Sequence, residues 1–184
     1  MAAPHRRWAA ELLHIWFHVL GPADRFGGGS CVDALLRRRF VRELAMFWTC
    51  RADTFLTDPR TALAAVVLFD QIPRNLYRDS PSAFACDPLA RAIAHGALRR
   101  GFDRALAPIE RQFLYLPLMH SEDAADQLLS LQLYALLPRQ MGWEFARSHA
   151  RMVRRFGRFP HRNKVLGRKS TAAERRAVAA GFSW

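Results

Sequence analysis

The apolar residues of this chain recur at helical spacing, and prolines and glycines interrupt them at short intervals. Residues 8–20 are apolar nearly all round and stop at Gly21-Pro22, which is typical of a buried helix with an end signal. Residues 31–49 repeat apolar side chains every three or four positions, as an amphipathic helix does. The sequence has no alternating run bounded by hairpin turns, so no strand is predicted. The pattern therefore predicts an all-α fold.

Two Asp-Pro pairs, Asp58-Pro59 and Asp87-Pro88, mark the starts of further helices. In each pair the aspartate is expected to cap the helix and the proline to occupy its first position. The first helix is expected to run to about Gln71, where Pro73 would prevent it from continuing. The second is expected to run to Gly101.

Four more helices are expected from similar signals, over residues 108–116, 121–137, 143–156 and 171–180. Pro117 would close the first of them. Ser121 would cap the second, with Glu122 and Asp123 in its first turn. Thr171 and Glu174 form a T-x-x-E capping box at the start of the last. The chain thus reads as a single domain over 1–184, with about eight helices in antiparallel pairs and the basic segment 139–184 packed on them.

The formal net charge is +12, and almost all of the excess lies near the C-terminus. Residues 1–138 hold 16 basic and 14 acidic side chains, whereas residues 139–184 hold 12 basic and two acidic ones. A field of this sign attracts phosphates, nucleic acid, anionic headgroups or acidic protein segments. A solvated basic face that serves solubility is the alternative.

Cysteine usage and hydropathy narrow the class of protein further. The three cysteines have no CxxC spacing, which argues against a disulfide scaffold or a cysteine zinc site and favours a cytoplasmic protein. The longest strictly apolar stretch, residues 62–69, is far short of the roughly 20 residues that a membrane span needs. We therefore expect no membrane span, and no motif indicates a cofactor.

Three blocks rich in polar residues stand out from the helical background. They read LFDQIPRNLYR over 68–78, YLPLMHSED over 115–123, and FGRFPHRN over 156–163 followed by LGRKST over 166–171. Together they closely resemble a bacterial family known as domain of unknown function 924, from about Trp16 to the C-terminus. Lys169 stands where many members have Glu, and His18 where Gly is common. The resemblance implies an all-helical superhelix of the tetratricopeptide-like type, and it implies no activity.

The candidate ligand-binding residues come from these blocks and from the helix between the second and the third: Asp70, Gln71, Arg74, Asn75, His120, Glu122, Asp123, His149, Arg158, His161, Arg162, Asn163 and Arg168. Guanidinium groups close to a helix N-terminus suit an anion. We therefore predict a helical binding module whose cleft takes a small anionic ligand or an acidic protein segment. In that cleft, Arg158, Arg162 and Arg168 would clamp the anion and Asn163 would orient it. His149 and His161 would line the pocket. Arg74 or Asn75 would alternatively hydrogen-bond the carbonyls at the end of the preceding helix.

Three other interpretations stay open, and no catalytic residue or metal ligand is assigned. A metal- or acid/base-dependent enzyme of the hydrolase kind would use His120, His149 and His161 with Glu122 and Asp123. The spacing of these histidines, however, matches no metal motif. The same arginines could instead pair with nearby carboxylates such as Asp70, Glu122 and Asp123 and tie the C-terminal loop to the bundle. Nucleic acid is a weaker alternative, because no RNA-binding signature accompanies the aromatic residues among the arginines.

Overall fold

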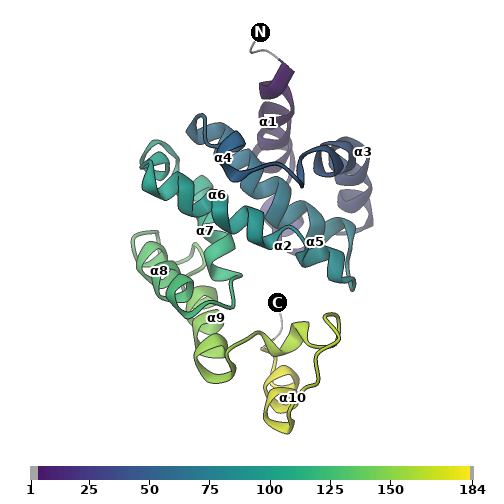
Figure 1. Ribbon diagram of the computed structural model, residues 1–184, viewed down its shortest axis with the longest axis vertical. Coiled ribbons are helices and arrows are strands. Elements are labelled where there is room, and N and C mark those ends of the chain that lie inside the picture. Colours follow the sequence, from purple (N-terminus) through teal and green to yellow (C-terminus); the bar gives the residue numbers. More distant parts are fainter. Residues whose placement is uncertain (1–3, 183–184) are drawn as a thin grey trace.

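The computed structural model describes residues 4–182, and all of their regular structure is helical (Figure 1). The α-helices are α1 (Pro4–His14), α2 (Pro22–Gly27), α3 (Ser30–Phe47), α4 (Pro59–Val66), α5 (Ile72–Leu76), α6 (Asp87–Arg99), α7 (Pro108–Met119), α8 (Ala124–Ala135), α9 (Trp143–Phe156) and α10 (Ala172–Ala179). Two π-helical turns (Ile15–Val19, Val67–Gln71) and four short 3-10 turns (Ala52–Phe55, Pro81–Phe84, Phe102–Ala105, Pro160–Arg162) join them. The predicted all-α class is confirmed, and the tetratricopeptide-like superhelix stays a prediction.

Helix α4 and the π-helical turn after it lie at the centre of the main hydrophobic core. Every residue from Thr61 to Gln71 is buried, including Asp70. Helices α1, α6 and α7 pack against this segment. A short helix that is apolar all round requires such a position, because no face of it gains from contact with water. Across residues 4–182, no helix is both long and apolar enough to span a bilayer.

Pro73 does not end the helix that begins at Pro59, contrary to the sequence expectation. The chain widens into a π-helical turn over Val67–Gln71 and then continues as α5 to Leu76. Pro73 therefore lies in the first turn of a new α-helical stretch, where a missing N–H costs no hydrogen bond. The carbonyl groups freed by the wider turn are bonded by side chains, since Arg74 donates to Asp70 O and Asn75 donates to Gln71 O. That part of the expectation is confirmed.

Two boundaries around α7 and α8 also differ from the prediction. Pro117 lies inside α7, which runs on to Met119 with all of its last residues buried. Packing outweighs the one lost hydrogen bond, and the amide of Gln127 bonds carbonyls at the end of α7, including Met119 O at 2.7 Å. The cap of α8 is Asp123, whose carboxylate accepts the amide of Ala125 at 2.8 Å, and not Ser121. Glu122 therefore lies before the helix rather than within it.

Other helix ends follow the sequence closely. Helix α9 covers 143–156 as predicted and ends at Gly157, which has the left-handed φ of 68°. The capping box of α10 is present, with Glu174 accepting the Thr171 amide at 2.7 Å. The Asp58 carboxylate accepts the amide of Thr61 at 3.0 Å. These ends depend on contacts within four residues of sequence.

The C-terminal residues build a second, smaller core of their own. Met152 and Val153 of α9 pack there with Phe159 and with Ala177 of α10. In Figure 1 the yellow α10 lies beyond α9, away from α1 to α5. Helix α9 contributes to both cores, since its Ala146 belongs to the main one, and the segment between α9 and α10 carries much of the third polar block.

Candidate functional site

A fully buried carboxylate, that of Asp70, lies at the centre of the candidate site. It comes from the π-helical turn Val67–Gln71, in the middle of the main core. His120 Nδ1 lies 2.8 Å from its Oδ1, Gln71 donates to its Oδ2, and Arg74 forms an ion pair at 3.3 Å. Burial alone would raise the pKa of Asp70, but the charge of Arg74 and the hydrogen bonds from His120 and Gln71 hold it below its usual range. Asp70 is therefore ionised at neutral pH.

Two neutral histidines lie on this side of the cluster: His120 contacts the Asp70 carboxylate, and His149 lies next to His120. Burial lowers the pKa of His120, and it lowers that of His149 to about 3 with a further contribution from His120. Because a carboxylate and a carbonyl only accept, Nδ1 of His120 donates to Asp70 and Nδ1 of His149 donates to Phe145 O at 2.8 Å. The two rings lie 5.9 Å apart between centroids. In both rings Nε2 is the unprotonated nitrogen.

Asp87 binds two arginines across the site, which corrects its predicted role as a helix cap. It occupies the first turn of α6, after Cys86, and the start of α6 has no side-chain cap. Its carboxylate lies 3.0 Å from Arg74 and 3.5 Å from Arg162. Burial raises the pKa of Asp87, and Arg74 opposes that rise. At an N-cap position this carboxylate would accept hydrogen bonds from the amides of its own helix. In the structure it pairs instead with the guanidinium groups of Arg74 and Arg162, whose charges would otherwise be left poorly compensated.

Arg162 lies between two aromatic rings. Its Cζ is 4.8 Å from the centroid of Phe84 and 4.6 Å from that of Phe159. The residue is only 7% exposed. Burial, and then the charge of Arg74, lower the pKa of Arg162 to about 10. In the described part of the chain, Nε of this side chain has no hydrogen-bond partner.

The other two arginines of the third block are held by carboxylates. Arg168 forms a two-pronged pair with Glu122, at 2.7 and 2.9 Å, and Glu122 also accepts the Phe159 amide at 2.7 Å. Arg158 forms a similar pair with Glu174, at 2.6 and 3.0 Å. The first pair ties the loop to the start of α8, and the second ties it to α10.

The remaining predicted residues lie at differing distances from this centre. His161 stacks near Phe159, at 5.8 Å between ring centroids, and burial together with Arg162 lowers its pKa to about 4. Asn163 is fully buried and donates to Ser170 Oγ at 3.1 Å, so it braces the loop. Asn75 accepts a hydrogen bond from Arg78 through its Oδ1, and Asp123 pairs with Arg91 at 2.9 Å on the surface. Those last two are not brought to the cluster.

We call this set of buried and half-buried residues the His–Arg cluster; it comprises Asp70, Arg74, Phe84, Asp87, His120, His149, Phe159, His161 and Arg162. Three of these residues, namely Phe84, Asp87 and Phe159, were not among the predicted site residues. The Phe159 signal was its place inside the third polar block, next to predicted site residues. Asp87 had no such signal, because its Asp-Pro context reads as a helix start. In residues 4–182, no group of three His, Cys, Asp or Glu side chains has an arrangement that could hold a metal ion.

The Glu122–Arg168 pair should determine how firmly the loop is held. We expect Glu122→Gln to lower the free energy of unfolding by about 1–2 kcal/mol, since a partly exposed charged pair is lost. Hydrogen exchange of residues 157–171 should rise in this variant. Glu144→Gln removes an exposed carboxylate that pairs with Arg147 at 3.2 Å, and it should change neither measurement. Unchanged exchange in Glu122→Gln would show that the pair does not anchor the loop.

The fold and the cluster together define an all-helical protein with a buried, largely neutralised set of histidines, arginines and carboxylates. The chain belongs to the bacterial family of proteins of unknown function DUF924, whose model matches residues 12–181. It is also similar to a solved structure of a protein of unknown function from Agrobacterium tumefaciens. The two share 36% sequence identity with a TM-score of 0.88, over 94% of this chain and 97% of that one. Comparison with curated proteins gives no significant match.

Proposed function

We propose that this protein is a cytoplasmic binding module that takes a small anion, through a carboxylate or phosphate group, at the guanidinium of Arg162. One observation carries the proposal: this guanidinium is buried with its pairing incomplete. Its nearest carboxylate, Asp87, lies 3.5 Å away and is closer to Arg74. Its Nε has no partner in the described residues. The three unbridged cysteines support a reducing compartment.

An oxyanion would complete the pairing of the Arg162 guanidinium. A buried charge without full pairing costs free energy, and a carboxylate or phosphate bound through two parallel N–H donors removes much of that cost. The two flanking rings hold the guanidinium plane in place. His120 and His161, whose lowered pKa values keep them neutral at pH 7, would add hydrogen bonds rather than charge.

Of the three arginines that the sequence suggested as a clamp, only Arg162 is assigned to the anion site. Arg158 and Arg168 each hold a carboxylate of this chain with two hydrogen bonds, so we assign them to positioning the loop. Asn163 braces the same loop from inside. An entering anion would therefore meet Arg162 on a segment that is anchored at both ends.

The test is a thermal melt of the protein in phosphate, citrate and chloride at matched ionic strength. A ligand that binds only the folded state stabilises it by about 2.7 kcal/mol at one hundred times its Kd. We expect a saturable rise in Tm with phosphate or citrate, lost in Arg162→Gln and kept in Arg176→Gln, which changes an exposed arginine of α10. A rise that survives Arg162→Gln, or one that chloride reproduces, would contradict the proposal.

A second candidate is acid/base catalysis by His120. The hydrogen bond from His120 Nδ1 to Asp70, at 2.8 Å, resembles the orientation of a general base by a carboxylate. This arrangement leaves Nε2 as the proton acceptor. Hydrolysis of p-nitrophenyl acetate that is lost in His120→Asn and retained in Arg162→Gln would favour this enzyme over the binding module.

A further inference from the structure

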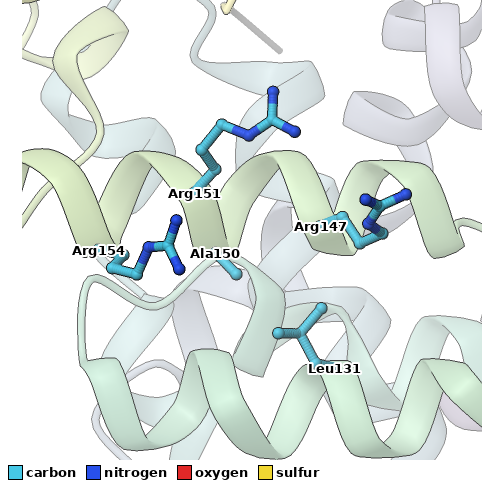
Figure 2. A pocket seen from close by; sticks show the side chains of 5 residues that line it. All are labelled: Leu131, Arg147, Ala150, Arg151 and Arg154. Atoms are coloured by element: carbon cyan, nitrogen blue, oxygen red, sulfur yellow. The ribbon is translucent and has the colours of Figure 1, made fainter.

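A groove between α8 and α9 lies outside the His–Arg cluster. It has a volume of about 250 Å³, and Figure 2 shows the five side chains that line it: Leu131, Arg147, Ala150, Arg151 and Arg154. Leu131 rises from α8 towards α9, and Ala150 faces it from the other helix (Figure 2). The arginines come from α9 alone. The groove thus has an apolar floor and one charged wall.

The charged wall is a regular row on the outer side of α9. Arg147, Arg151 and Arg154 follow one another at i, i+4 and i+7, a spacing that places them on one helix face over roughly 10 Å. Arg147 pairs with Glu144 at 3.2 Å, and both side chains are at least half exposed. Within residues 4–182, the side chains of Arg151 and Arg154 form no hydrogen bond or ion pair. His149 points from the same helix into the buried cluster.

The α8 side of the groove is aliphatic, and its lining residue is Leu131. Leu128 precedes Leu131 by three positions, so the two share a face of α8, and Leu128 is 60% exposed. The apolar surface of α8 therefore extends beyond the groove. An occupant that presents carboxylates to α9 and apolar side chains to α8 would satisfy both walls.

We propose that this groove docks an acidic, amphipathic helical segment of a partner protein. Carboxylates at i, i+4 and i+7 of such a helix match the arginine row, and leucines on the adjacent face cover Leu128 and Leu131. Nucleic acid fits less well, because arginines line only one wall and, among residues 4–182, no aromatic ring lines the groove to stack on bases. This surface is separate from the anion site at Arg162.

The experiment uses the full chain and a labelled helical peptide in fluorescence anisotropy. The probe carries three glutamates at i, i+4 and i+7 and leucines on the neighbouring face. The test variant is Arg151→Glu/Arg154→Glu. The control is Arg38→Glu/Arg42→Glu, which makes the same change of charge on the exposed face of α3. A second test variant, Leu131→Gln, probes the apolar floor without a charge change.

We expect the peptide to bind saturably, at least tenfold more weakly to the Arg151/Arg154 variant and severalfold more weakly to Leu131→Gln. The control variant should bind within twofold of the wild type, and a peptide with glutamine in place of glutamate should not bind. Equal weakening by both double variants would overturn the proposal, because it would reflect net charge alone. So would absence of peptide binding, or tighter binding of a single-stranded RNA or of anionic lipid vesicles that depends on Arg151 and Arg154.

Discussion

Replacing Asp70 by Asn should lower the free energy of unfolding by about 3–5 kcal/mol, the cost of breaking a buried ion pair from one side. The carboxylate is fully buried and holds three partners, His120, Gln71 and Arg74. Asparagine keeps the shape and accepts one hydrogen bond from His120. It leaves two arginines, the half-buried Arg74 and the buried Arg162, with the single carboxylate of Asp87.

Urea unfolding at pH 7.5 measures this effect. Asp53→Asn is the matched control, because its carboxylate is 69% exposed and lies 3.6 Å from Arg100. A surface pair of that kind contributes about 0–1 kcal/mol. If the two variants lost similar stability, the Asp70 carboxylate would not be the centre of the cluster. A variant at position 70 that is unfolded at 25 °C would indicate a loss at least as large as predicted.

The second large effect is a loss of stability in mild acid. Burial lowers the folded-state pKa of His149 to about 3 and that of His161 to about 4, whereas unfolded histidine titrates near 6.5. Between those values the unfolded chain binds more protons than the folded one, so stability falls as pH falls. Each histidine should remove about 1–2 kcal/mol between pH 7.5 and pH 5.

Asp70 and Glu174 do not contribute to this fall. Their pKa values are lowered in the fold, so their contribution is lost only as pH falls below the ordinary carboxyl range. His149→Asn, whose amide can still donate to Phe145 O, should reduce the fall between pH 7.5 and pH 5 by about 1–2 kcal/mol, and the remainder comes from His161 and from His120, whose pKa is also lowered. His14→Asn, at an exposed position on α1, should not alter it. A pH profile that is unchanged in His149→Asn would show that this histidine is not buried in its neutral form.

The His–Arg cluster and the proposed docking groove lie on opposite faces of α9. His149 points from α9 into the His–Arg cluster, and Arg147, Arg151 and Arg154 lie on its solvent side. The positive charges of residues 139–184 thus fall into two groups. Part of it is neutralised inside the chain by Glu122, Glu174 and Asp87, and part faces outward. The net charge alone does not distinguish the arginines that are paired inside the chain from those that face outward.

The candidate site was only partly predictable for a similar reason. The three polar blocks drew attention to Asp70, His120 and Arg162, which the structure brings together, because their density of polar residues is unusual for buried helices. Asp87 escaped prediction, since an aspartate before a proline at a helix start has a sufficient local explanation. Its real partners, Arg74 and Arg162, lie 13 and 75 positions away along the chain. Such contacts leave no mark in local sequence.

The sequence by itself determined the class of fold and those helix ends that depend on neighbouring residues. Asp58 and the Thr171–Glu174 box act within four positions, so their hydrogen bonds follow from the sequence alone. Only the tertiary structure decided that α7 continues through Pro117, where burial of its neighbours outweighs a missing N–H, and that a π-helical turn places Pro73 in the first turn of α5. It also decided which arginines are neutralised. Each pairing depends on which carboxylates the packed helices bring close to an arginine. Breaking a buried pair from one side then costs several kcal/mol of stability, because a buried charge is left without a partner.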